Sequence, residues 1–236
     1  MFRVGRYEIS EPATCCSIIG KSKEKIRKTG KKAVRENAEL LEIRLDKMED
    51  FSNINSLFDF EIPTIATNRA KREGGHFEGD EEERIEILSK CIDGGASCID
   101  IELSTKDELI EKITQKARDN NCSVILSYHD FEKVPSIENL RKTVGEMEKY
   151  DHDFKKIIGY SNSSEESVNI LDFLIISMGE TENNIITFAM GEKGSFTRVT
   201  APVLGSPFTY ASMKEKTAPG QLKFSTVKDI LYKYKE

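Results

Sequence analysis

The segment SVILSYHDFEKVPSIENLRKTVGEMEKYDHDFKKIIGYS, residues 123–161, contains the pattern that decides the fold. It begins with an apolar, β-branched run (123–130), continues with a stretch of helical spacing (136–150), and ends in a second apolar run (155–161). A strand, a helix and a strand in this order form a crossover between two parallel strands. The segment therefore predicts one such unit of a parallel sheet.

The same alternation recurs along the whole chain of 236 residues. The expected strands are 13–20, 39–46, 62–68, 97–103, 123–130, 155–161, 184–190 and 207–212. The expected helices are 21–36, 52–59, 80–93, 105–119, 136–150, 164–177, a looser 194–205, and 225–235 with Ser225 as its N-cap. Eight units of this kind make a closed barrel. We therefore predict an α/β fold, one (β/α)₈ TIM barrel of parallel strands over residues 1–236. An open doubly wound sheet is the alternative, but no G-x-G-x-x-G follows the first strand.

The composition narrows the class of protein. Charged residues make up 32% of the chain, the net charge is −6, and both signs are mixed along it, which argues against a general nucleic-acid binder. The basic segment 20–35 is interpreted as one solvated helix face. No apolar run approaches the roughly 20 residues of a membrane span. Five cysteines without a C-x-x-C motif indicate reduced, buried thiols in a cytoplasmic protein.

Charged side chains gather where the expected strands end. In parallel barrels these positions, with the loops after them, form the active site. The residues are Glu42, Arg44 and Asp46, then Arg69 and Glu73, Asp100 and Glu102, Ser127 and His129, Arg198, and the loop 216–221. Asp46 and Asp130 are interpreted as caps or loop-forming residues. Unpaired buried charges cost several kcal/mol each, so the set indicates a polar pocket, and its arginines indicate an anionic ligand.

The lysine pair at 155 and 156 suggests what that pocket does. If one amine faces the barrel interior, low dielectric and neighbouring guanidinium groups lower its pKa and make it a nucleophile toward a ketone or aldehyde. His129 on the neighbouring strand is the candidate acid–base group. The residues thus predict an imine-forming barrel acting on an anionic carbonyl compound. Parity does not decide between Lys155 and Lys156. His76 and His152 are expected at the surface, and no metal site is expected because the histidines are not spaced as ligands.

Seven blocks of sequence resemble the type I 3-dehydroquinate dehydratases. They are LEIRLD (41–46), TNRAKREGG (67–75), DIELS (100–104), SYHDF (127–131), KKIIGYS (155–161), GSFTRV (194–199) and TAPGQ (217–221). They occur in the order of that family, and the resemblance covers essentially the whole chain. It implies conversion of the small molecule 3-dehydroquinate to 3-dehydroshikimate, with loss of water, in the shikimate pathway. It also implies that no metal or organic cofactor takes part.

The resemblance further implies individual roles. Lys156 aligns with the imine-forming lysine, His129 with the acid–base histidine and Glu73 with the carboxylate that orients it. Residues similar to Glu42, Arg44 and Arg69 contact the ring hydroxyls and carbonyl side of the substrate, and Asp100 lines the same region. Arg198 and Gln221 are expected to hold the substrate carboxylate. Thr217 stands where many relatives have serine, which keeps the hydroxyl.

Two other functions are compatible with these residues. One is an imine-forming aldolase for a phosphorylated sugar, with the loop MGEKGSF (190–196) binding phosphate. The other is a barrel that binds a metabolite without turning it over. Members of the dehydratase family are often homodimers, which makes a homodimer one of the expectations, although the residues show no interface signal. Whether an N-terminal hairpin closes the bottom of the barrel is also left open.

Overall fold

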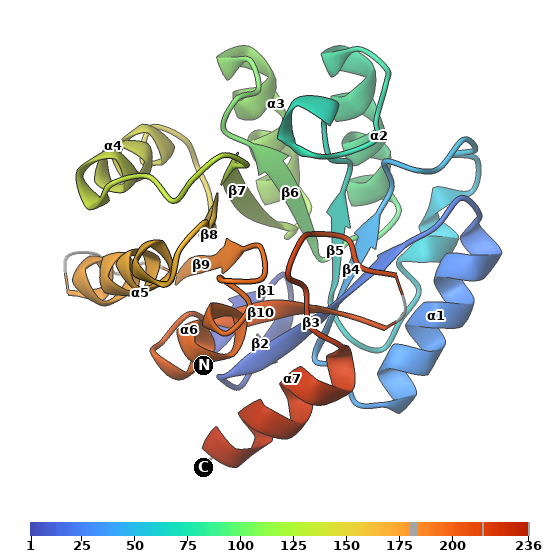
Figure 1. The fold of residues 1–236 in the computed structure, drawn as a ribbon. Helices are drawn as coiled ribbons and strands as arrows, with labels where there is room; N and C mark the ends of the chain where they lie inside the picture. Colours follow the sequence, from blue (N-terminus) through green and yellow to red (C-terminus); the bar gives the residue numbers. More distant parts are fainter. Residues whose placement is uncertain (180–183, 214, 236) are drawn as a thin grey trace.

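The computed structural model describes residues 1–179, 184–213 and 215–235. In that part, eight parallel strands form one sheet in the order β10-β3-β4-β5-β6-β7-β8-β9, and β9 lies against β10, so the barrel is nearly closed (Figure 1). The strands are β3 (Ala13–Ile19), β4 (Leu40–Arg44), β5 (Thr64–Thr67), β6 (Cys98–Glu102), β7 (Ser123–Asp130), β8 (Phe154–Tyr160), β9 (Asn184–Met190) and β10 (Phe208–Ser212). The predicted (β/α)₈ TIM barrel is confirmed.

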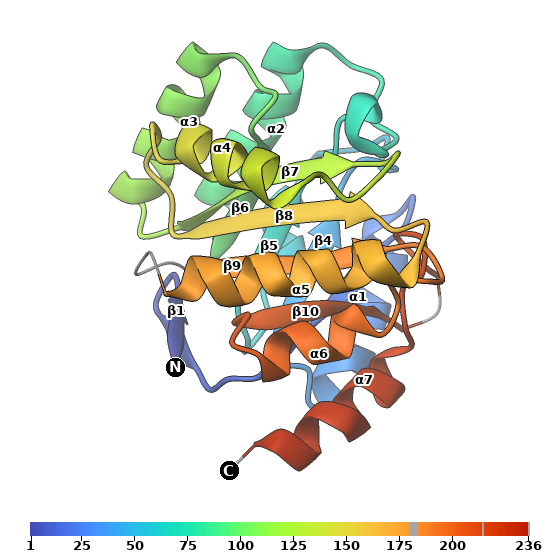
Figure 2. The same cartoon turned by 60° about the vertical axis from the view of Figure 1, so that its left-hand side comes forward.

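The helices lie outside the barrel and cover its strands (Figure 2). They are α1 (Lys23–Arg35), α2 (Glu81–Asp93), α3 (Asp107–Asp119), α4 (Ile137–Met147), α5 (Ser164–Met178), α6 (Thr197–Val203) and α7 (Phe224–Leu231). Short 3₁₀ turns add η1 (Ile54–Leu57), η2 (Lys71–Glu73) and η3 (Tyr232–Tyr234). Among the described residues, no helix is both long enough and apolar enough to cross a membrane.

The helix predicted at 52–59 is wrong. The segment forms only the single 3₁₀ turn η1, which buries Ile54 and Leu57 against the core. Asn53 precedes this turn in a left-handed conformation, with φ of 47°, so the backbone cannot continue as an α-helix from Phe51. Strands β4 and β5 are therefore joined by a connection without an α-helix.

The start of the last helix also differs from the prediction. Helix α7 begins at Phe224, whose ring is buried, and Lys223 occupies the cap position in an extended conformation. Ser225 thus lies inside the first turn, where its hydroxyl does not cap the helix. The expected range 225–235 is divided between α7 and η3.

An N-terminal hairpin closes the bottom of the barrel, which answers the question that the sequence left open. Strands β1 (Phe2–Val4) and β2 (Tyr7–Ile9) pair antiparallel. The centroid of the Phe2 ring lies 5.9 Å from the ring centroid of Phe154 and 5.5 Å from that of Phe208, and both of these residues are on barrel strands. These three aromatic side chains fill the end of the barrel opposite the polar strand ends.

The alternation of β8 decides between the two lysines. Phe154 and Ile158 belong to the cluster that fills the barrel interior, whereas Ile157 belongs to the cluster between strands and helices. Lys156 shares the parity of the interior residues. Lys155 faces the helical layer, where its Nζ lies 2.6 Å from Glu148 Oε1 just after α4. The inward lysine is Lys156.

Candidate active site

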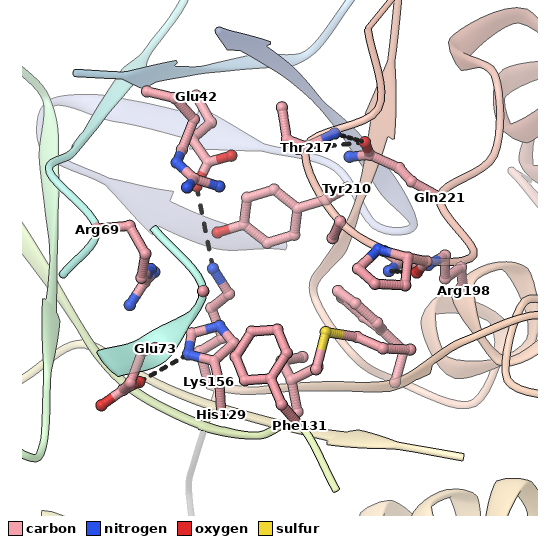
Figure 3. A pocket seen from close by; sticks show the side chains of 17 residues that line it. Glu42, Arg69, Glu73, His129, Phe131, Lys156, Arg198, Tyr210, Thr217 and Gln221 are labelled. Atoms are coloured by element: carbon pink, nitrogen blue, oxygen red, sulfur yellow. Dashed lines mark hydrogen bonds and ion pairs between the residues drawn. The ribbon is translucent and has the colours of Figure 1, made fainter. Parts of the chain in front are cut away.

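A pocket opens at the carboxyl ends of the barrel strands, with Lys156 at its centre (Figure 3). Parallel register places Lys156 on β8 opposite Ser127 on β7, which in turn lies opposite Glu102 on β6. Of the ten residues assigned to the site from sequence, nine line the pocket: Glu42, Arg44, Arg69, Glu73, His129, Lys156, Arg198, Thr217 and Gln221. The tenth, Asp100, lies beneath them in contact with Lys156.

Carboxylates, not guanidinium groups, are the nearest charges to the Lys156 amine. Its Nζ lies 2.9 Å from Asp100 Oδ2 and 4.0 Å from Glu42 Oε1, and the residue is only 4% exposed. The Tyr210 ring centroid is 4.3 Å from the same nitrogen. The sequence predicted arginine as the neighbour that acts on the amine, whereas Arg69 reaches it only through Asp100. These contacts hold the amine at one place on the pocket floor.

Asp100 is stabilised as an anion by its surroundings. Burial raises the pKa of this carboxyl, but the charges of Arg69 and Lys156 more than offset burial and hold the pKa well below its usual range. Arg69 Nη2 lies 2.7 Å from Asp100 Oδ1, and the Ser127 hydroxyl donates to the same oxygen at 2.6 Å. The carboxylate can therefore hold the lysine without taking part in proton transfer.

His129 is arranged to act as a base. Its Nδ1 lies 2.9 Å from Glu73 Oε2, and because a carboxylate only accepts, we assign the proton to Nδ1, which leaves Nε2 with its lone pair. Burial, followed by the charges of Arg69 and Lys156, lowers the pKa of His129 well below 6.5. Burial raises the pKa of Glu73, against the effect of Arg69. Figure 3 shows the imidazole beside the Lys156 side chain.

The three arginines of the pocket differ in what they are bound to. Arg44 is paired with Asp46 through two contacts, of 2.7 and 3.0 Å. Arg69 is paired with Asp100 and Glu102 and donates to Ser127. Both guanidinium groups are thus already neutralised within the chain.

Arg198 has no such partner. No carboxylate forms an ion pair with it among the residues that the structure describes, and its Nε has no hydrogen-bond partner there. Its Nη2 donates to the carbonyl of Pro219 at 3.1 Å, and its guanidinium lies 4.3 Å from the Phe188 ring centroid. Burial lowers the pKa of Arg198 to about 9. A buried, uncompensated guanidinium that lines a pocket is suited to bind an anion.

The loop that carries Gln221 is tied to the pocket floor by hydroxyl groups. Gln221 Oε1 accepts from the amide and the hydroxyl of Thr217, at 2.7 and 3.1 Å. The Thr217 hydroxyl lies 2.9 Å from that of Ser17, which donates to Glu42 Oε2. Ser17 was missed from sequence, although its inward parity on the first barrel strand and its register opposite Glu42 are the signals that identify it.

Two aromatic residues that line the pocket beside Lys156 and His129 were also missed. Tyr210 on β10 places its ring against the Lys156 amine, and Phe131 stacks on His129 at a centroid distance of 6.3 Å. An aromatic side chain carries no chemical signal of its own, and Phe131 was quoted only as the end of the block SYHDF (127–131). Phe131 also covers Gly74, where a Cβ atom would lie 2.3 Å from its ring, and the left-handed backbone of Gly74, with φ of 73°, favours glycine as well.

The remaining polar predictions can now be placed. Asp46 is buried and binds Arg44, and it also holds a loop, because its Oδ2 accepts from the amide of His76 at 3.1 Å and lies 3.1 Å from Nδ1 of that half-exposed side chain. It is therefore loop-forming, as predicted, and not a helix cap. Asp130 accepts from the amides of Glu132 and Lys133 and shapes the loop after β7, as predicted. In the described ranges 1–179, 184–213 and 215–235, no three His, Cys, Asp or Glu side chains are arranged to hold a metal ion. All five cysteines are buried and free.

Comparisons with known proteins agree on one family. A family model described as type I 3-dehydroquinase matches residues 14–236. A 3-dehydroquinate dehydratase of Methanosarcina acetivorans is 35% identical, covering 98% of both chains, and one of Methanocaldococcus jannaschii is 37% identical, covering 92% of this chain and 96% of that relative.

Solved structures give the same result. A type I 3-dehydroquinate dehydratase of Clostridium difficile, determined with covalently modified comenic acid, superposes with a TM-score of 0.87 at 27% identity, over 97% of this chain and 93% of that one. The enzyme of Geobacillus kaustophilus gives 0.89 at 26% identity, over 94% and 91%. A 3-hexulose-6-phosphate synthase, at 15% identity and a TM-score of 0.61, shares the fold alone.

The environment of His129 predicts a titration below its ordinary value. Because its pKa is lowered in the folded state, the imidazole stays neutral at pH 7 and gains a proton only as the pH falls below 6.5. Below pH 6.5 the folded chain binds fewer protons at this site than the unfolded chain does. The free energy of unfolding that the neutral His129 contributes is therefore lost as the pH falls below 6.5. We expect an NMR titration of the His129 ring, assigned with a His129→Gln variant, to give a midpoint below 6.5. A midpoint at or above 6.5 would contradict the described environment.

Proposed function

The chain belongs to the type I 3-dehydroquinase family, and from this membership we propose which of its residues carry out the reaction. It is a hydro-lyase that removes water from 3-dehydroquinate to give 3-dehydroshikimate through a lysine imine, in the shikimate pathway. Family membership therefore decides against the two alternatives that the residues alone left open, the aldolase and the non-catalytic barrel. The roles that follow are our proposal for this chain.

One observation carries the assignment of roles. A single pocket contains a buried amine, a histidine held by a carboxylate, and a buried guanidinium without an acidic partner among the described residues. These three groups correspond to the imine-forming amine, the acid–base group and the carboxylate anchor that the reaction needs. The residues are Lys156, His129 and Arg198.

Binding would begin with the substrate carboxylate. Arg198 binds it, because the substrate carboxylate forms the ion pair that no described carboxylate of the chain forms with this guanidinium. The amide of Gln221, on the loop held by Thr217, donates to the same carboxylate. Glu42, Arg44 and the surrounding polar wall then face the ring hydroxyls, and the ketone reaches the floor of the pocket.

Chemistry would begin with attack of the Lys156 amine on the ketone carbon. A C–N bond forms, the carbonyl oxygen leaves as water, and a protonated imine remains, with His129 moving the protons. His129 Nε2 next takes a proton from the carbon beside the imine; the electron pair of that C–H bond forms a C=C bond, and the π pair of the C=N bond moves onto the nitrogen to give an enamine. The nitrogen lone pair then re-forms the C=N bond, the C=C bond shifts by one carbon, and the tertiary C–O bond breaks, so that the hydroxyl leaves as water with the proton from His129. Addition of water to the imine then releases the product and restores the amine.

Glu73 supports these steps without touching the substrate. Its carboxylate holds Nδ1–H of His129 and so keeps Nε2 available to the reacting carbon. A positioned acid–base group contributes typically ~10²–10⁴-fold to rate. Loss of His129 should therefore reduce turnover by about that factor, while the carboxylate anchor at Arg198 keeps substrate binding.

The two adjacent lysines provide a matched test of the imine. We expect borohydride, added with 3-dehydroquinate, to leave a stable mass increase on Lys156, located by peptide mapping. Lys156→Met should abolish both the adduct and turnover, because no other described amine lines the pocket. Lys155→Met removes an equally buried cation from the outer face of the same strand and should keep both. An adduct on another residue, or none under conditions of proven binding, would refute the assignment.

We further propose that the chain works in the cytoplasm as a homodimer and without nucleic acid. Its net charge of −6 opposes binding to phosphate backbones. Exposed apolar side chains on the packed helices α5 and α6 offer a face for a second copy: Val168, Ile175, Met178 and Val203. Light scattering should give about twice the chain mass of 26.7 kDa, and Ile175→Glu should reduce it to one chain. A wild-type chain that is monomeric at micromolar concentration would refute the dimer.

A further inference from the structure

Arg84 is a buried guanidinium outside the barrel that no step of the reaction uses. It lies in the first turn of α2, in the run EEER, yet it is only 1% exposed. Its Nη1 donates to the carbonyl of Asn68 at 3.1 Å, and its Nη2 donates to Thr105 Oγ1 at 2.8 Å and to Glu81 Oε1 at 2.6 Å. Nη1 also pairs with Glu102 Oε2. Contacts on both terminal nitrogens thus hold the guanidinium in place.

Glu102, at the end of β6, is fully buried and divides its two carboxylate oxygens between two tasks. Oε2 is held by Arg84 from the helical layer. Oε1 accepts from the amide of Ala70 at 2.9 Å and lies 3.2 Å from Arg69 Nη1. Because Arg84 fixes Oε2, the other oxygen can hold both the amide of Ala70 and the guanidinium of Arg69 in place.

The first connection leads to the amine. Arg69, held by Glu102, extends its Nη2 to Asp100 Oδ1 at 2.7 Å. Asp100 then uses its other oxygen to hold Lys156 Nζ at 2.9 Å. The ammonium position is thus set by a line of alternating charges that begins outside the barrel wall.

The second connection leads to the imidazole. The amide of Ala70 immediately precedes η2, the turn that carries Glu73. Glu73 in turn holds Nδ1 of His129 at 2.9 Å. The start of this turn is therefore pinned to the carboxylate that also positions Arg69.

We propose that Glu102, fixed by Arg84, is a positioning residue that sets the Lys156 amine and the His129 imidazole relative to each other. Neither residue touches the substrate. The carboxylate anchor does not depend on them, because Arg198 lies on α6 and Gln221 on the loop before α7. Loss of this link should therefore slow the chemical steps and leave substrate binding nearly unchanged. The inference rests on the proposed roles of Lys156 and His129.

The test compares Arg84→Met with the conservative Arg84→Lys. For Arg84→Met we expect kcat to fall by about 100-fold and KM to change by less than threefold, as measured with 3-dehydroquinate. Two further rates should fall with kcat. The first is the rate at which the borohydride-trapped adduct forms on Lys156. The second is the rate of solvent deuterium exchange at the carbon beside the ketone, divided by the amount of imine present. Arg84→Lys should restore part of kcat, because an ammonium group can still reach Glu102. Glu102→Gln, which keeps the shape and loses the charge, should act in the same direction as Arg84→Met.

Lys155→Met is the matched control, since it also removes a buried cation that pairs with one carboxylate behind the barrel wall. It should lower the melting temperature but leave both rates within twofold. The proposal is overturned if Arg84→Met and Glu102→Gln keep kcat within threefold, if only one of the two rates falls, or if KM rises as much as kcat falls. A wild-type chain that forms no adduct would refute the proposed roles themselves, and the link between them with it.

Discussion

The ion pair between Lys156 and Asp100 is the contact around which the rest of the site is arranged. Two opposite charges 2.9 Å apart in a barrel interior lose their hydration, and the pair persists only if further groups satisfy the carboxylate. Arg69 and Ser127 do so on its other oxygen. The same arginine lies close enough to His129 to help keep that imidazole neutral. The Arg69–Asp100 pair thus influences both the amine and the base.

Two of the three arginines of the pocket form ion pairs within the chain, and the third has no acidic partner among the described residues. Arg44 and Arg69 are bound to carboxylates of the chain, which fixes the walls. Arg198 has only a carbonyl and an aromatic ring beside it within the described structure, and it lies where the loop of Gln221 covers the pocket. We propose that the substrate carboxylate completes this part of the molecule. On this proposal, specificity for a carboxylate follows from one missing partner rather than from the number of arginines.

Strand periodicity and the polar strand ends, which are both local patterns, were sufficient for the barrel and for the place of its pocket. The individual roles of the ten site residues came from the family resemblance and stay predictions. Strand parity could not distinguish Lys155 from Lys156, and in the structure packing against the interior or the helices separates them. The ion pairs were not predictable either: guanidinium groups were expected beside the lysine, yet Asp100 lies between Lys156 and Arg69. Arg84 lies in an acidic run typical of a solvated helix face, so its burial depends on tertiary contacts alone.

The most direct measurement of this account is a crystal structure of the borohydride-reduced complex with 3-dehydroquinate. The account predicts continuous electron density from Lys156 Nζ to the former ketone carbon, with His129 Nε2 facing the adjacent carbon. It also predicts that the ligand carboxylate lies on the guanidinium of Arg198. Density that joins the ligand to a different side chain, or a carboxylate bound away from Arg198, would contradict the central claim that one buried amine and one unpaired guanidinium define the reaction.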